Sequence, residues 1–233
     1  MTGAAREVLT LEAAAFADRT ARVIEDAIQT AVAARGVCRI VLAGGRTPAH
    51  VYRVLAARDG IPWNQVEVFI GDERCVPPTH VDSNFRMIAD TLLDRVPIPA
   101  AQIHRLRGEV DGEMAADEYQ SLLDPLPEPK FDFVLTGIGA DGHTASLFPG
   151  DARVTTETAW AMTAISPPEF AVRERVGLSM RALCSSRVVC VLCTGAEKHP
   201  VRTAILSGEA RAQSLPAALI HGTERTLWIV DPL

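Results

Sequence analysis

The sequence lacks any long hydrophobic run, although 48% of its 233 residues are hydrophobic. No stretch of about 18 or more apolar residues occurs, so we expect neither a membrane-spanning helix nor a membrane partner. The first residues lack the basic stretch and apolar block of a secretory signal, which predicts a cytoplasmic protein. The apolar content suffices for one large core, and we expect a single domain over residues 1–233.

Cysteines are few, odd in number and irregularly spaced, which argues against a disulfide framework. Two of the five, Cys190 and Cys193, form a CxxC pair inside the apolar run 188–193. In a strand, residues three apart point to opposite faces. We therefore interpret this pair as buried core thiols, not as zinc ligands or a redox centre.

Positive charge is also scarce: the net charge is −6, and no basic stripe occurs along the chain. Nucleic acid is therefore not expected as a partner. An anionic substrate would instead need a local cluster of positive charge. The chain has 21 arginines but just two lysines, Lys130 and Lys198. Because lysine is so rare here, Lys198 is notable for its position in a glycine-bearing turn.

Three catalytic motifs are absent from the sequence. There is no GxSxG turn for a serine nucleophile. There is no HExxH or paired His/Cys set to hold a metal ion, and no GxxxxGK[ST] loop for a nucleoside triphosphate. Metal-activated water therefore has no obvious site, so we expect metal-free chemistry, and nucleoside triphosphate chemistry is not favoured.

What is present is an alternation of short apolar runs with helical stretches. The runs resemble buried strands, at residues 39–42, 66–70, 131–135, 188–192 and 226–230. The helical stretches lie at 11–35, 48–58, 85–95, 112–123 and 201–206. We expect Thr10 to cap the first helix and Gly36 to end it. Such alternation predicts an α/β fold with a mostly parallel sheet covered on both faces.

Four polar, glycine-bearing motifs directly follow predicted strands, at residues 44–48, 71–74, 137–143 and 195–198. Ligands of open α/β sheets bind beyond the carboxyl ends of the strands. We therefore expect the four motifs to converge on one crevice.

The first motif, Gly44-Gly45-Arg46-Thr47-Pro48, joins a strand to a helix. Thr47 is expected to cap that helix and Pro48 to occupy its first position. Glycines let the backbone approach a ligand, and free amides at a helix start bind phosphate. A tight turn with a good cap is the alternative interpretation.

The second motif contains Asp72 and Arg74, and Asp82-Ser83-Asn84 follows it. Arg74 is suited to clamp a phosphate or to stabilise an oxyanion. The alternative is a charged loop of salt bridges. The segment around Ser83 and Asn84 precedes a helical stretch and has the composition of an N-cap.

The third motif, residues 137–143, fits GxGxxG spacing, but no clear long helix follows it, so a dinucleotide site is not favoured. His143 ends this loop at a strand terminus, where an imidazole can reach a substrate and transfer protons near neutral pH. Asp141 either orients that imidazole or simply makes the turn. A purely structural histidine is the alternative.

The fourth motif places Lys198 at a strand end, where it can act as a point charge for an anion. Arg173 and Arg175 follow the segment 166–168 and can add charge to the same region. Solvated loops are the alternative for these three side chains.

Together these motifs resemble the 6-phosphogluconolactonase family in order and spacing, across roughly residues 36–233. The stretch from Gly139 to Pro149 is the most specific part. The resemblance implies a modified Rossmann-like three-layer α/β/α fold, of the type shared by glucosamine-6-phosphate deaminases, ribose-5-phosphate isomerases and CoA transferases. It implies hydrolysis of 6-phospho-D-glucono-1,5-lactone in the oxidative pentose phosphate pathway, without a cofactor.

The resemblance also suggests residue roles. His143 would activate water, Asp141 and Arg74 would assist, and the remaining positions would bind the sugar phosphate: Gly44, Gly45, Arg46, Thr47, Asp72, Ser83, Asn84, Gly142, Arg175 and Lys198. Two positions depart from the family pattern. Arg46 stands where serine is common, and Gly177 where threonine is frequent, which weakens the assignment of Arg175. A small sugar phosphate is the expected partner, and the sequence leaves open a monomer or a homodimer.

Two other functions fit parts of this pattern. A glucosamine-6-phosphate deaminase shares the fold, but it typically has tyrosine at the position of Arg74 and glutamate at the position of Phe148. A phenyl ring cannot transfer protons, so that mechanism is impaired here. A sugar-phosphate sensor usually carries a helix-turn-helix region, whereas the roughly 38 residues before the first predicted strand suggest one helix.

Overall fold

The computed structural model describes residues 6–233 and is built around a parallel sheet. Each pair of neighbouring strands in this sheet is parallel. In spatial order the strands are β1 (Arg6–Thr10), β10 (Arg225–Val230), β9 (Ser186–Cys193), β6 (Phe131–Gly137), β2 (Cys38–Leu42), β3 (Val66–Ile70) and β5 (Ile103–His104). The five strands expected from the sequence are all present, and the expectation of a mostly parallel sheet is confirmed.

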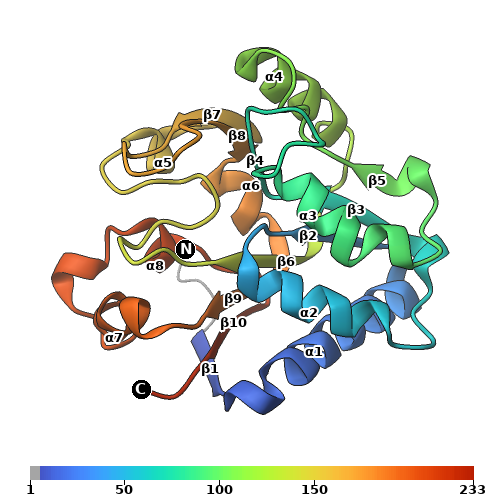
Figure 1. Cartoon of the computed structure of the whole chain (residues 1–233), viewed down its shortest axis with the longest axis horizontal. Coiled ribbons are helices and arrows are strands. Elements are labelled where there is room, and N and C mark those ends of the chain that lie inside the picture. Colours follow the sequence, from blue (N-terminus) through green and yellow to red (C-terminus); the bar gives the residue numbers. More distant parts are fainter. Residues whose placement is uncertain (1–5) are drawn as a thin grey trace.

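Helices cover both faces of the sheet, which gives three layers (Figure 1). One face packs against α1 (Ala13–Arg35), α2 (Arg46–Ala56) and α3 (Asn84–Thr91). The other face packs against α4 (Gly112–Leu123), α5 (Arg153–Thr156), α6 (Met180–Cys184), α7 (His199–Leu206) and α8 (Pro216–Leu219). Short 3₁₀ turns complete the chain: η1 (Trp63–Gln65), η2 (Leu93–Arg95), η3 (Ala100–Gln102), η4 (Ala196–Lys198) and η5 (Ala210–Ala212). None of the described helices is long and apolar enough to cross a bilayer.

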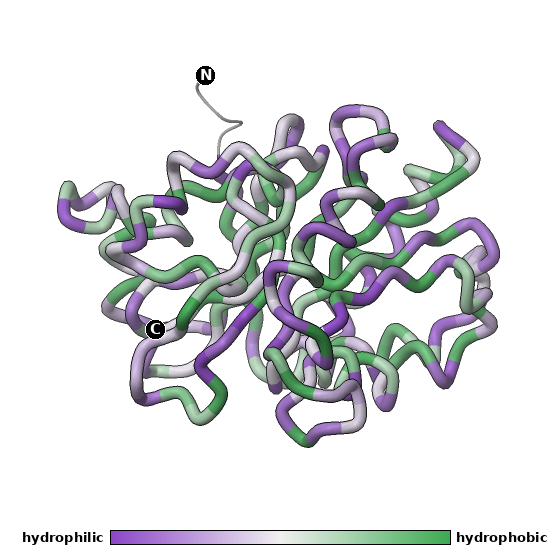
Figure 2. Tube along the Cα trace, turned by 90° about the horizontal axis from the view of Figure 1, so that it is seen from above, coloured by the Kyte–Doolittle hydropathy of each residue, from purple (hydrophilic) through white to green (hydrophobic). Residues whose placement is uncertain are grey.

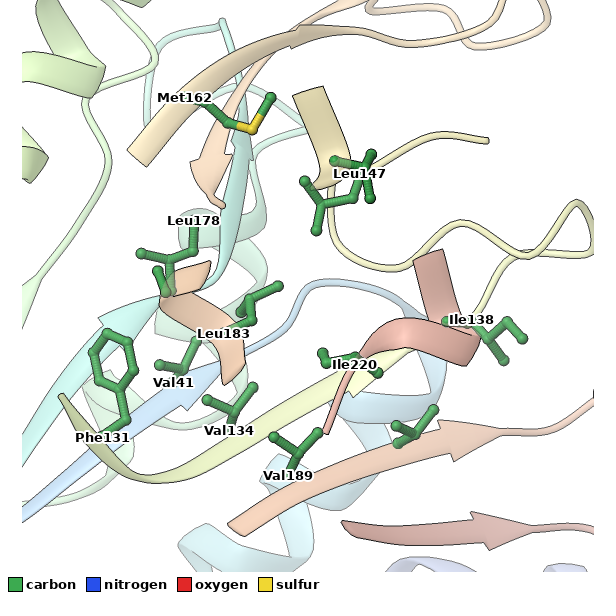
Figure 3. Close-up of a cluster of buried hydrophobic side chains, with 14 of the residues drawn as sticks. Val41, Phe131, Val134, Ile138, Leu147, Met162, Leu178, Leu183, Val189 and Ile220 are labelled. Atoms are coloured by element: carbon green, nitrogen blue, oxygen red, sulfur yellow. The ribbon is translucent and has the colours of Figure 1, made fainter. Parts of the chain in front are cut away.

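Each central strand contributes side chains to the hydrophobic cores on both faces of the sheet, because alternate side chains point to opposite faces. In β2, Val41 packs with the α4 and α6 side, whereas Ile40 and Leu42 pack under α1 and α2. Figure 3 shows Val41 with Val134 and Val189 from the neighbouring strands. Hydrophobic and hydrophilic stretches alternate along the chain (Figure 2), as expected for buried strands joined by exposed turns.

A second, antiparallel sheet was not anticipated from the sequence. It consists of β4 (Asp72–Arg74), β8 (Glu174–Leu178) and β7 (Ala161–Ile165). Its middle strand β8 is buried over most of its length, but β4 has only three residues. Such short segments carry no readable period, and β4 lies in the charged stretch that the sequence suggests is a loop.

The start of the chain differs from the prediction. Thr10 does not cap the first helix, because it is the last residue of edge strand β1. Helix α1 begins at Ala13, and its N-cap Glu12 makes no side-chain capping bond. Strand β1 escaped prediction because its side chains are mostly exposed and give no alternating pattern. Gly36 does end α1, with a left-handed φ of 77°.

Other helix boundaries also shift. Helix α2 begins at Arg46 with Gly45 as its N-cap, so Thr47 is not the cap and Pro48 is the third helical residue. The expected helix at 85–95 is divided into α3 and η2, and the one at 201–206 begins earlier, at His199. Ser83 caps α3 through its hydroxyl, as the sequence predicts.

The order of the strands determines where a ligand can bind. From β2 the chain proceeds outward through β3 to β5, whereas β6, β9, β10 and β1 extend in the opposite direction. The carboxyl ends of β2 and β6 therefore flank a topological switch point, where adjacent loops diverge and leave a crevice. The loops that begin at Ala43 and Ile138 lie on its two sides.

Candidate active site

A cavity of about 760 Å³ opens at this switch point. The loops that follow β2, β3, β6 and β9 all contribute to its wall, as the sequence predicts. Nine of the candidate site residues line it: Gly44, Gly45, Arg46, Thr47, Asp72, Arg74, Asn84, His143 and Lys198. Four others, Ser83, Asp141, Gly142 and Arg175, are not among the lining residues. The His143 imidazole and the turn at 44–47 thus share one cavity.

His143 is fixed by the carboxylate two residues before it. Its Nδ1 atom lies 2.6 Å from Oδ1 of Asp141, and its backbone N–H donates to the same oxygen at 3.1 Å. Burial alone would raise the pKa of Asp141, but the hydrogen bonds and the charge of His143 lower it below the ordinary value. An ionised Asp141 accepts the proton of Nδ1, which leaves Nε2 of His143 as the lone-pair nitrogen.

The backbone before His143 makes room for its ring. A methyl group on Gly139 would lie 2.2 Å from Cε1 and Nδ1 of His143, so any side chain there would displace the imidazole. Two aromatic rings complete the packing: Phe148 lies 5.1 Å and Phe170 5.8 Å from the imidazole, centroid to centroid. The ring is therefore held on several sides while its side chain stays 21% exposed.

The turn after β2 presents a helix start to the cavity. As the first residues of α2, Arg46 and Thr47 have backbone amides without a helical acceptor. The Thr47 hydroxyl lies 2.8 Å from that of Thr194, which connects this turn to the end of β9. Gly44 packs so closely on Asn84 that a Cβ atom would lie 1.9 Å from Oδ1 of the amide.

Asp72 connects three parts of the wall. Its carboxylate accepts a hydrogen bond from the Ser146 hydroxyl at 2.6 Å, and thus anchors the loop that follows His143. The Asn84 amide donates to the backbone carbonyl of Asp72 at 2.8 Å and contacts its carboxylate at 3.3 Å. Asp72 is only 8% exposed, so most of its bonding capacity is used inside the protein.

Glu73 belongs to the second motif, but the sequence suggests no role for it. Its buried carboxylate accepts hydrogen bonds from the amides of Arg74, Asn84 and Phe85 and from the Ser83 hydroxyl, at 2.7 to 2.9 Å. Burial raises the pKa of Glu73, although these hydrogen bonds oppose the shift. Ser83 therefore supports the wall from behind, through Glu73 and the start of α3.

Arg74 and Arg175 are paired residues on the antiparallel strands β4 and β8. Arg74 donates to the carbonyl of Asp82 and lines the cavity. Within residues 6–233, the Nε atoms of both arginines have no hydrogen-bond partner. Burial, and next the charge of Arg74, lower the pKa of Arg175. Of these two guanidinium groups, that of Arg74 is placed to meet a substrate.

The turn after β9 places Lys198 at the cavity wall, directly before α7. The backbone of this turn is bonded to Asp231, whose Oδ2 accepts the amide hydrogen of Gly195 at 2.8 Å. Asp231, Thr194 and Phe170 were not predicted from the sequence. Asp231 was detectable in principle, since it directly follows β10, but a single carboxylate without a glycine nearby gave no motif.

The side chains around the cavity do not form a metal site. Among residues 6–233, no group of three or more His, Cys, Asp or Glu side chains is arranged to hold a metal ion. The Asp141 carboxylate is engaged by Nδ1 of His143. The site instead combines an oriented imidazole, free helix amides and three cationic side chains, those of Arg46, Arg74 and Lys198. That combination suits water activation beside an anionic substrate.

Several known proteins are similar to this chain in sequence or in fold. A 6-phosphogluconolactonase of Synechocystis sp. is 36% identical over 211 residues, with 88% of this chain and 86% of the relative covered. One of Mycobacterium leprae is 38% identical over 215 residues, with the same coverage. The solved 6-phosphogluconolactonase of Thermotoga maritima has a TM-score of 0.86 at 32% identity, and covers 98% of this chain and 100% of its own.

All three relatives match the present chain over most of their length, and the solved structure also matches it in fold. The likeness confirms both the resemblance seen in the sequence and the expected α/β architecture. A sequence model described as glucosamine-6-phosphate isomerases/6-phosphogluconolactonase matches residues 11–228. The chain therefore belongs to the glucosamine-6-phosphate isomerase/6-phosphogluconolactonase family.

Proposed function

We propose that this protein hydrolyses 6-phospho-D-glucono-1,5-lactone to 6-phospho-D-gluconate, the lactone-opening step of the oxidative pentose phosphate pathway. One observation carries the proposal: an imidazole bonded to Asp141 shares a single cavity with the start of helix α2, where backbone amides are free to bind an anion. The naming of the similar proteins as 6-phosphogluconolactonases supports the same activity.

The phosphate is held at the start of α2. Arg46 and Thr47, the first residues of α2, line the cavity, and their backbone amides lie at the positive end of the helix dipole. Lys198 and the Arg46 side chain line the same cavity and add positive charge. Binding the phosphate here fixes the lactone ring toward His143 and lowers the entropic part of the barrier.

His143 acts as the general base. Its Nε2 atom takes a proton from water, and the water oxygen attacks the lactone carbonyl carbon. Arg74 stabilises the negative charge that develops on the carbonyl oxygen. When the tetrahedral intermediate collapses, the bond from the carbonyl carbon to the ring oxygen breaks. The protonated imidazole then returns the proton to that oxygen, so the products are a carboxylic acid and a hydroxyl group.

The deaminase alternative requires a proton-transferring side chain beside the histidine. That place holds Phe148, whose ring packs 5.1 Å from the imidazole and is 7% exposed. The site therefore has no second acid or base at this position for opening an amino-sugar ring. Release of ammonia from glucosamine 6-phosphate would favour the deaminase over the lactonase.

The direct test is an assay with freshly generated 6-phosphogluconolactone, corrected for spontaneous hydrolysis. A rate that scales with enzyme concentration supports the proposal. Binding of the phosphosugar without turnover would instead favour a sensor. We assign the reaction to the cytoplasm, in keeping with five cysteines that are all free.

A further inference from the structure

Asp231 contacts residues on both sides of Lys198 in the sequence. Its Oδ2 atom accepts the amide hydrogen of Gly195 at 2.8 Å, three residues before the lysine. Its Oδ1 atom lies 3.3 Å from Nε2 of His199 and 2.7 Å from the guanidinium of Arg202. One carboxylate thus connects the turn that carries Lys198 with the first turn of α7.

We propose that Asp231 is a positioning residue, which holds the 195–198 turn so that Lys198 meets the substrate phosphate. This inference rests on the lactonase activity proposed above. Asp231 itself follows the last strand, β10, on the terminal segment that passes α7 (Figure 1). Strand β10 holds the start of this segment in place, because it pairs with both β9 and β1 up to Val230.

The turn needs such a support. Residues 196 and 197 are exposed, and the turn is closed by local backbone bonds, from the amide of Lys198 to the carbonyl of Gly195 at 2.9 Å and from the amide of His199 to the carbonyl of Ala196. A flexible lysine on a loose turn would lose conformational entropy on binding phosphate. Fixing Gly195 and His199 beforehand removes part of that cost.

A carboxylate beside an anion site would ordinarily repel the substrate, and Asp231 does line the cavity. Here its charge is balanced by Arg202, which is 3% exposed and also donates to the backbone carbonyl of Asp231 at 2.8 Å. Burial would raise the pKa of Asp231, but hydrogen bonds from Gly195 and His199 and the nearby charges lower it. The carboxylate therefore stays ionised, and its oxygens contact Gly195, His199 and Arg202 around the turn.

The two possible roles of Asp231 predict opposite results for Asp231→Asn. If it positions Lys198, KM for the phosphorylated lactone rises about tenfold while kcat changes little. If it acts mainly through repulsion, loss of the charge lowers KM. A KM that falls or stays unchanged therefore overturns the inference. The wild-type rate on the same substrate tests the lactonase proposal separately, because an inactive wild type would refute that proposal whatever the variant does.

Asp132 provides a matched control. It is also a carboxylate paired with an arginine, 2.7 Å from Arg35. However, it lies at the amino end of β6, whereas the cavity lies at the carboxyl ends of the strands. Asp132→Asn is expected to lower stability without a change in KM. A similar rise of KM in both variants would show a general effect of destabilisation and contradict a positioning role.

A double substitution tests whether Asp231 acts through Lys198. If it does, Asp231→Asn adds no more than about twofold to the KM of Lys198→Ala, because the supported side chain is already gone. Fully multiplicative effects would show that Asp231 acts by another route. Unphosphorylated glucono-1,5-lactone completes the design: Asp231→Asn should leave its kcat/KM unchanged, and an equal loss on both lactones would rule out a role in phosphate binding.

Discussion

The Nδ1 atom of His143 lies 2.6 Å from Oδ1 of Asp141, and the two residues belong to the same loop. The same carboxylate oxygen also accepts the backbone amide of His143. The loop thus carries its own orienting group and needs no partner from a distant element. This arrangement favours one tautomer of the imidazole and fixes the direction of its ring.

The first prediction concerns the base itself. His143→Ala removes the group that accepts the proton of water, so we expect kcat to fall by about 10²- to 10⁴-fold. KM should change much less, because the helix start and Lys198 still hold the phosphate. Steady-state kinetics, corrected for spontaneous hydrolysis, measure both values. A variant with near-normal kcat would end the assignment of His143 as base.

Asp141→Asn tests the orienting group. An asparagine amide can donate to Nδ1 and so favour the tautomer with a proton on Nε2, which is the wrong form for a base. We expect kcat to fall by about 10- to 10³-fold, with little change in KM. Unchanged kcat would mean that Asp141 merely makes the turn.

The same substitution should affect stability in a pH-dependent way. The pKa of Asp141 is lower in the folded protein than its ordinary value. Its stabilisation is therefore present above the pKa of an unfolded aspartate, about 4, and is lost as the pH falls through the lower folded value. Because the side chain is 39% exposed, we expect less than about 1 kcal/mol. Urea unfolding at pH 7 and pH 3 should show the two proteins converging in acid.

Gly139→Ala tests the close approach behind the imidazole. The added methyl group would lie 2.2 Å from the ring, so His143 must turn away and kcat should fall by at least about tenfold. Gly36→Ala is the control: it lies at the end of α1, with a left-handed φ and open space around it. It should cost about 1 kcal/mol of stability and leave activity intact. Equal activity loss in both variants would indicate general destabilisation.

Much of this site was predictable because parallel strands place their carboxyl ends on one edge. The motifs after β2, β3, β6 and β9 were recognised as local turns, and strand polarity alone was enough to bring them together. The buried strands were equally clear, since short apolar runs bounded by turn residues, such as 131–135, are typical of strands buried on both faces.

Other features depend on contacts between distant segments and leave little local trace. Phe170 reaches His143 from the loop between β7 and β8, and Thr194 reaches Thr47 across the sheet edge. Thr47 looked like a helix cap because its residue type suits one, but that tertiary hydroxyl contact takes its place. Strand β1 is short and exposed, and is defined by its pairing with β10 and not by its own pattern.

Chelation tests the prediction of metal-free catalysis. The donors near His143 do not form a three-residue metal site within the part of the chain that the structure describes, and Nδ1 is already bonded to Asp141. Activity should therefore persist, within about twofold, after dialysis against EDTA, because the mechanism proposed above uses an imidazole and Arg74 and no metal ion. Loss of turnover that added metal restores would contradict this prediction.

Lys198→Ala, assayed on a phosphorylated and an unphosphorylated lactone, tests whether Lys198 recognises the phosphate. Lys198 lines the cavity together with the start of α2, where it contributes a compact positive charge. Removing it should raise KM for 6-phosphogluconolactone by about tenfold or more and change kcat little, since a charge-assisted contact is lost in both ground and transition states. Unphosphorylated glucono-1,5-lactone provides the control, because it lacks the group that the lysine binds. An equal loss on both lactones would show that Lys198 contributes to the shape of the site and not to recognition of the phosphate.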